Sequence, residues 1–180
     1  MAQQFSEISD KLQAFIEAQH MFFVATAARE GRVNVSPKGM DTLRVLSPRR
    51  VVWLNATGSG NETAAHLLDT PRMTLMFCSF ERQPMILRLY GTARALHESD
   101  AEWAELLALF PPIPGARNIV VLEVETVQPS CGYAVPFYDF VEQRDVLQTW
   151  AAKKGPEGLH VYQQEKNRVS IDGLPTGLPT

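Results

Sequence analysis

The sequence predicts a mainly β fold, an antiparallel barrel or sandwich. Six or seven short runs are rich in β-branched and aromatic residues, and short turns separate many of them. Most of these connections are too short for the crossover helix that parallel strands need. At 180 residues, the chain suits a single domain over 1–180.

The N-terminal part contains one expected helix and four expected strands. Ser6 can cap the helix, and the apolar spacing that follows ends near His20. Gly31 suits a tight turn, because glycine readily takes positive φ. The strands are expected at residues 21–26, 32–36, 42–46 and 51–56.

The rest of the chain alternates between strands and helices. Pro71 ends a loop and short helix over 57–69, and Gly91 suggests a bulge in a long strand. The remaining expected strands are 72–79, 85–96 and 118–127, and a helix is expected over 98–110. Residues 130–180 form a C-terminal extension, with turns at 131–138, helices at 144–154 and 156–165, and an irregular tail from 167.

Charge and hydropathy argue against several classes of partner. The net charge of −3 provides no general attraction to nucleic acid or to an anionic membrane. No apolar run reaches membrane-spanning length, and the N-terminus is too polar for a signal peptide. The two cysteines match no zinc or redox spacing. We therefore expect a cytoplasmic protein with reduced thiols, and no nucleic-acid or membrane partner.

Two glycine-containing stretches indicate a ligand site. They are residues 34–39, Asn-Val-Ser-Pro-Lys-Gly, and residues 57–63, Thr-Gly-Ser-Gly-Asn-Glu-Thr. Each follows a β-rich run, and the second opens a helical pattern. Glycines allow close backbone approach, helix-start N–H groups favour anions, and Lys38 adds a positive charge. The pattern suits a phosphate-bearing ligand, although both stretches are also ordinary turn compositions.

The sequence lacks the usual catalytic motifs. Gly58 and Gly60 resemble the start of a dinucleotide-binding fingerprint, but its third glycine would fall at Thr63. There is also no Walker A loop and no Gly-x-Ser-x-Gly elbow. The four histidines lack ligand spacing, so no metal site is expected and no catalytic residue is assigned. What remains is a set of binding groups, which suits either a cofactor with its own redox chemistry or a plain binding module.

Four segments in order identify a resemblance to a known family. They are Phe-Val-Ala-Thr at 23–26, the glycine-containing stretch at 31–39, residues 53–62, and Leu-Arg-Leu-Tyr-Gly-Thr-Ala-Arg at 87–94. Together they resemble the FMN-binding split-barrel proteins related to pyridoxamine 5′-phosphate oxidase. Residues 130–136 and 167–174 resemble a largely uncharacterised branch of that family.

The resemblance implies a six-stranded split β-barrel with flanking helices, and a homodimer that binds FMN in grooves at its interface. It implies a flavin-dependent oxidoreductase acting on a small organic substrate. By position, the cofactor-binding residues would be Asn34, Ser36, Pro37, Lys38, Thr57, Gly58, Ser59, Gly60, Asn61, Glu62 and Arg88. The substrate side would involve Cys131, Tyr133 and Asn167.

One departure and two alternatives accompany this resemblance. Members that oxidise pyridoxamine phosphate carry an Arg-x-His near the C-terminus, where this chain has Arg168-Val169-Ser170, so that activity is not expected. A deazaflavin-dependent reductase is one alternative. The other is a non-catalytic stress protein that binds flavin or haem, for which His66 is the candidate axial ligand.

Overall fold

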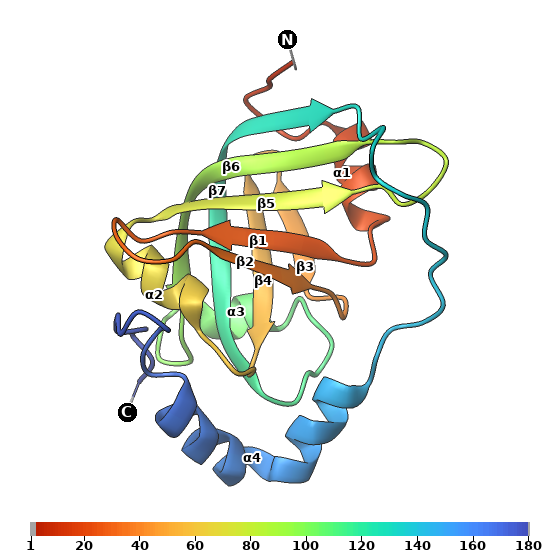
Figure 1. The fold of residues 1–180 in the computed structure, drawn as a ribbon. Coiled ribbons are helices and arrows are strands. Elements are labelled where there is room, and N and C mark those ends of the chain that lie inside the picture. Colours follow the sequence, from red (N-terminus) through yellow and green to blue (C-terminus); the bar gives the residue numbers. More distant parts are fainter. Residues whose placement is uncertain (1–2, 180) are drawn as a thin grey trace.

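A single antiparallel sheet of seven strands dominates the computed structural model, which describes residues 3–179 (Figure 1). The strands are β1 Phe22–Thr26, β2 Asn34–Lys38, β3 Leu43–Ser47, β4 Arg50–Ala56, β5 Arg72–Cys78, β6 Ile86–Leu96 and β7 Ala116–Ser130. Their order in the sheet is β2-β1-β5-β6-β7-β4-β3. This is one strand more than the six that the resemblance implied.

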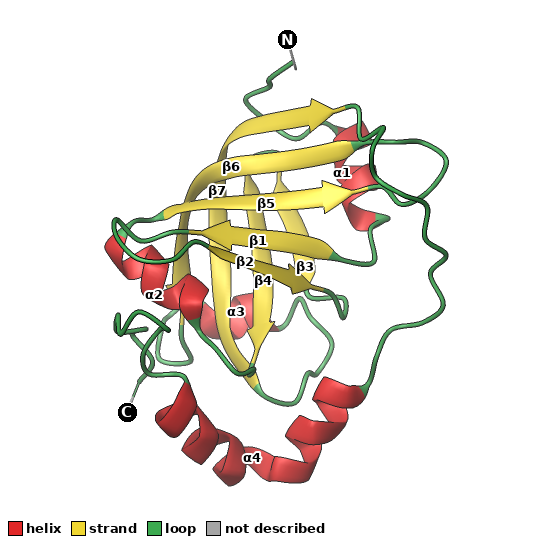
Figure 2. Cartoon of the chain, in the orientation of Figure 1, coloured by secondary structure: helices red, strands yellow, loops and turns green. Residues whose placement is uncertain are grey.

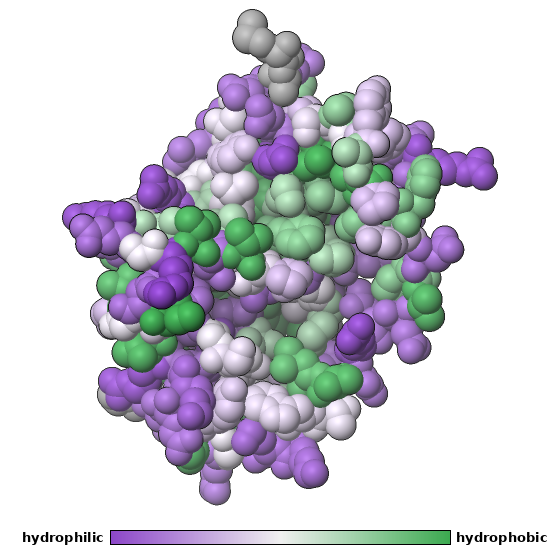
Figure 3. Space-filling model, in the orientation of Figure 1, coloured by the Kyte–Doolittle hydropathy of each residue, from purple (hydrophilic) through white to green (hydrophobic). Residues whose placement is uncertain are grey.

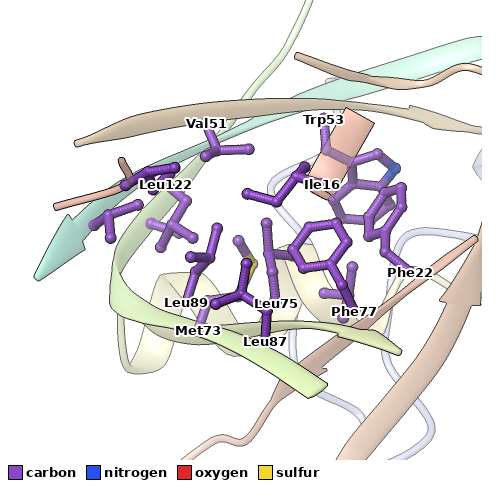
Figure 4. Close-up of a cluster of buried hydrophobic side chains, with 14 of the residues drawn as sticks. Ile16, Phe22, Val51, Trp53, Met73, Leu75, Phe77, Leu87, Leu89 and Leu122 are labelled. Atoms are coloured by element: carbon purple, nitrogen blue, oxygen red, sulfur yellow. The ribbon is translucent and has the colours of Figure 1, made fainter. Parts of the chain in front are cut away.

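The sheet curves over so that β1, β2, β5 and β6 lie in front of β3 and β4 (Figure 1). Its inward-facing side chains form the main core, in which Trp53, Phe77 and Leu89 are almost completely buried (Figure 4). Within the described residues, the two edge strands β2 and β3 are not paired with each other. The barrel is therefore split at this point, as expected.

Within residues 3–179, four helices accompany the sheet (Figure 2). They are α1 Asp10–Glu17, α2 Glu62–Asp69, α3 Trp103–Leu107 and α4 Val146–Lys166. The prediction for α1 began too early, because Ser9 rather than Ser6 accepts the capping hydrogen bond from the Leu12 N–H. α3 has only five residues, and α4 merges two predicted helices across a kink at Gly155, whose φ is 68°.

The bulge predicted at Gly91 is confirmed. The register between β6 and β7 shifts between Tyr90 and Gly91. A side chain at Gly91 would overlap the backbone carbonyl of Glu123 on β7, so glycine is required by close approach of the two strands. β7 is longer than predicted, since it begins before Asn118 and continues beyond Val127.

The C-terminal extension crosses the outside of the barrel and returns to α2. Residues 131–145, here called the strap, have no regular secondary structure, and Tyr138 N–H bonds to the Phe80 carbonyl. After α4, residues 167–177 turn back, with a bridge between Val169 and Pro175. None of the helices within residues 3–179 has the length and apolarity to cross a membrane.

Candidate anion-binding groove

A groove of about 840 Å³ opens beside β2 and brings the two glycine-containing stretches together. Figure 3 shows the surface hollowed in this region. The walls come from β2, the end of β4, the loop into α2, the start of β7 and the tail after α4. Eight predicted residues line it: Asn34, Ser36, Lys38, Gly58, Ser59, Gly60, Asn61 and Glu62.

Strand alternation places the polar residues of β2 in the groove. Asn34, Ser36 and Lys38 alternate with Val35 and Pro37, which are exposed. Proline is tolerated here because β2 is an edge strand. The Ser36 hydroxyl donates to Asn34 Oδ1 at 2.8 Å, so these polar groups form a connected surface.

Lys38 is a half-buried cation without a carboxylate partner in the described part of the chain. Its Nζ lies 4.9 Å from the centroid of the Trp53 ring. Burial, with a smaller contribution from the positive charge of Arg117, lowers the pKa of Lys38 to about 8. A bound anion would relieve both effects.

Arg117 is the most buried cation of the groove, which Arg32 and Lys166 also line, and it was not predicted. It is only 6% exposed, and its Nη1 donates to Asn167 Oδ1 at 2.6 Å. Burial lowers its pKa to about 10, despite an opposing effect from Tyr162. Among residues 3–179 it has no ion-pair partner, and its Nε has no hydrogen-bond acceptor. A buried cation with uncompensated charge is costly unless a ligand supplies the anion.

Hydrogen bonds with Gly115 and with Gln163 of α4 hold the loop before α2 in place. Thr57 is 1% exposed, and its hydroxyl donates to the Gly115 carbonyl at 2.8 Å. Gln163 Nε2 on α4 donates to the same hydroxyl at 2.7 Å. These bonds leave Gly58, Ser59 and Gly60 lining the groove. Thr57 therefore supports the loop rather than lining the groove.

Several predicted residues lie outside the groove of their own chain. Arg88 is on β6, three strands from β2, and its Nη1 donates to Ser130 Oγ at 3.2 Å. Pro37 faces the opposite side of β2. Cys131 and Tyr133 are exposed on the strap. A role for them in this site would require a second subunit.

Asn167, which was predicted on the substrate side, lies at the C-terminal end of α4. It is fully buried, and it contacts Arg117 and Gly58 rather than open space. Val169, Ser170 and Ile171 line the groove beside it. Ser170, the third residue of the Arg168-Val169-Ser170 segment, accepts the N–H groups of Asp172 and Leu174 at its Oγ.

His66 also lines the groove but is enclosed. It is 1% exposed, its Nδ1 lies 3.1 Å from Thr26 Oγ1, and its Nε2 has no partner in the described structure. Axial ligation of a haem iron at Nε2 would therefore require the groove to open. No cluster of three or more metal-ligating His, Cys, Asp or Glu side chains occurs in the described range.

The fold and the groove define a split-barrel protein with a candidate anion site beside the edge strand β2. Residues 8–131 match the family described as pyridoxamine 5′-phosphate oxidase. The chain is 36% identical to the pyridoxamine 5′-phosphate oxidase family protein ustO of Aspergillus flavus, over 95% of this chain and 76% of that protein. It belongs to the pyridoxamine 5′-phosphate oxidase family.

Solved structures show the same fold at low sequence identity. HupZ of Group A Streptococcus has a TM-score of 0.56 and 19% identity, with 73% of this chain and 99% of that chain covered. The FAD binding protein of Mycobacterium smegmatis has a TM-score of 0.50 and 13% identity, with 71% and 98% covered.

Proposed function

We propose that this protein binds FMN in the groove and is a flavin-dependent oxidoreductase acting on a small organic substrate. The observation that carries the proposal is the pair of half-buried and buried cations, Lys38 and Arg117, which have no carboxylate partner within residues 3–179 and lie beside the Gly58–Gly60 loop. Membership of the family and the flavin bound by its M. smegmatis structural relative are consistent with it.

The residues of the groove fit a phosphorylated flavin. The groove volume of about 840 Å³ lies within the range usual for cofactor sites, about 300–1,000 Å³. Lys38 and Arg117 would attract the phosphate through their charges. Arg117 Nε has no acceptor within residues 3–179, but it is enclosed, so a direct bond from it would require the groove to open, as for His66 Nε2. Asn34 and Ser36 offer hydrogen bonds along β2. The flavin would supply the hydride or electron transfer, while the chain binds and orients it.

The proposal includes a homodimer in which a second copy completes the site. Exposed apolar side chains lie on β2, at Val35, and on the strap, at Tyr133 and Phe137. In Figure 3, apolar groups gather at the upper right, around the strap and the β5–β6 hairpin. We expect light scattering to give twice the chain mass of 20.1 kDa. A monomer that still retains FMN would contradict the shared site.

The proposed cofactor is tested by the visible absorption spectrum of the freshly purified protein, with mass spectrometry of the released chromophore. A flavin spectrum and the mass of FMN are expected. A colourless protein that also fails to bind added FMN would contradict the proposal and favour a deazaflavin or a binding role without redox chemistry.

FMN affinity should fall as the pH rises above about 8. The pKa of Lys38 is about 8 in the free protein, because of burial and then Arg117. A bound phosphate favours the ammonium form, so the pKa of Lys38 is higher in the complex. FMN affinity therefore falls as the pH rises from the pKa of Lys38 in the free protein to its higher pKa in the complex, by at most about tenfold per pH unit.

Fluorescence titration of FMN between about pH 7 and pH 9.5 measures this loss, since the flavin phosphate is fully ionised over most of that range. Lys38→Arg is the control, because arginine stays protonated and should flatten the profile. An equally flat profile for the wild type would argue against a contact between Lys38 and the phosphate.

A further inference from the structure

The segment after α4 is docked onto the groove at its start and at its outer turn. We call residues 167–177 the C-terminal clasp. It starts at Asn167, which is fully buried. At its outer turn, the Ile171 N–H donates to the Glu62 carboxylate at 3.1 Å, and Asp172 pairs with Arg32. The clasp therefore joins the groove to the β1–β2 turn and the start of α2.

Asn167 bridges the two sides of the proposed phosphate site. Its Oδ1 accepts from Arg117 Nη1 at 2.6 Å, and its Nδ2 donates to the Gly58 carbonyl at 3.0 Å. The orientation of the amide is fixed by these partners, because a guanidinium can only donate and a carbonyl can only accept. One side chain thus sets the distance between the buried cation and the glycine loop.

The backbone of Asn167 is held as firmly as its side chain. Its carbonyl accepts from Asn61 Nδ2 at 3.3 Å and from the Thr176 hydroxyl at 2.7 Å. Asn61 in turn accepts from Asn118 Nδ2 at 3.3 Å. Both the side chain and the backbone carbonyl of Asn167 are therefore paired, which fixes its geometry because leaving either one unpaired would be costly.

The Asn167 amide is neutral, and this determines how much of the Arg117 charge is left uncompensated. An aspartate at this position would pair with Arg117 and cancel its charge, whereas asparagine orients the guanidinium and leaves the charge uncompensated. Nη1 is occupied by Asn167, and Nε has no acceptor in the described structure. The cation is therefore fixed in position while its charge is available to a ligand.

We propose that Asn167 is a positioning residue for the anion site, acting through Arg117 and the Gly58 loop, so that phosphate recognition depends on the buried contacts of Asn167. This inference rests on the proposed function only for the identity of the ligand as a flavin phosphate.

The first test compares FMN with riboflavin, which lacks the phosphate. Asn167→Ala should reduce the ratio of FMN affinity to riboflavin affinity by about tenfold, the loss expected for a misplaced charged hydrogen bond. A merely structural role would weaken both ligands equally and leave the ratio unchanged, which would overturn the proposal.

A second variant preserves the contact with Arg117, so that a specific loss of phosphate recognition can be told from misfolding. Asn167→Asp retains an acceptor for Arg117 but neutralises its charge, so the ratio should also fall. Asp172→Asn is the control, because it loosens the outer turn of the clasp without touching Arg117. Its ratio should not fall, since the change only removes a carboxylate from Arg32, a cation that lines the groove. An equal fall of the ratio in Asp172→Asn would contradict a specific role for Asn167.

A double-mutant cycle tests whether Asn167 acts through the arginine. In an Arg117→Gln background, Asn167→Ala should cause little further loss of the FMN-to-riboflavin ratio, because the group being positioned is gone. If Asn167→Ala lowers the FMN-to-riboflavin ratio by the same factor with and without Arg117, Asn167 acts by another route and the proposal is overturned.

Inorganic phosphate separates this inference from the proposed function. If the wild type binds no flavin but gains thermal stability with phosphate, the flavin assignment fails, and the same variants are compared by that stabilisation. A loss in Asn167→Ala but not in Asp172→Asn would then support the inference, and equal stabilisation of all three proteins would overturn it. A wild type that binds neither ligand, or does not distinguish FMN from riboflavin, overturns it as well.

Discussion

Lys38→Glu is expected to lower FMN affinity by at least about 100-fold while the protein stays folded. The change removes an attractive charge and adds a repulsive one next to the phosphate, which together are worth about 3 kcal/mol or more. Folding should survive, since Lys38 is half-buried on the edge strand β2 and the new carboxylate can pair with Arg117 nearby. Flavin content after purification and circular dichroism measure the two effects.

The matched control is Lys153→Glu, which changes the net charge by the same amount. Lys153 is exposed on α4 and does not line the groove. Its FMN content should equal that of the wild type. Undiminished FMN in Lys38→Glu would remove Lys38 from the phosphate site.

Gly91→Ala is expected to destabilise the fold by about 3 kcal/mol or more, the cost of forcing a side chain into packed backbone. The added Cβ would overlap the Glu123 carbonyl, and this carbonyl belongs to β7, a central strand that cannot move without disturbing β4 and β6. The midpoint of urea unfolding should fall sharply, and the melting temperature by about 6–12 °C.

Gly58→Ala provides the comparison for this loss. A Cβ at Gly58 would meet nothing within 4 Å, and its backbone does not require positive φ. Its unfolding free energy should stay within about 0.5 kcal/mol of the wild type or rise slightly. Equal urea midpoints for Gly91→Ala and the wild type would mean that β6 and β7 are further apart than described.

The strands were predictable from the sequence because their local signals agree with their final environment. Alternation in β2 and the glycine in β6 reflect which side of a strand is buried and how closely two strands approach. Helix limits were less predictable. Both Ser6 and Ser9 are acceptable caps, and only tertiary packing selects Ser9, since the Ile8 N–H bonds to the Pro48 carbonyl.

The groove was only partly predictable. The polar residues of β2 and the loop before α2 carry a local composition that indicates an anion site. Arg117 carries no such signal, because an isolated arginine at the start of a strand is usually solvated. The role of Asn167 depends on a contact with Gly58, which is 109 residues away in the sequence. Sequence periodicity does not show which distant residues make contact.

The dependence of the groove on the C-terminal clasp has a consequence for the order of events during synthesis. The barrel strands end at Ser130, so the sheet can form while later residues are still within the ribosome. Asn167 and Thr176, which fix Arg117 and the Gly58 loop, emerge later. If the groove binds a phosphorylated cofactor as proposed, a nascent chain with a complete barrel still lacks the contacts of Asn167 and Thr176, and loading of the cofactor would follow the release of these residues from the exit tunnel.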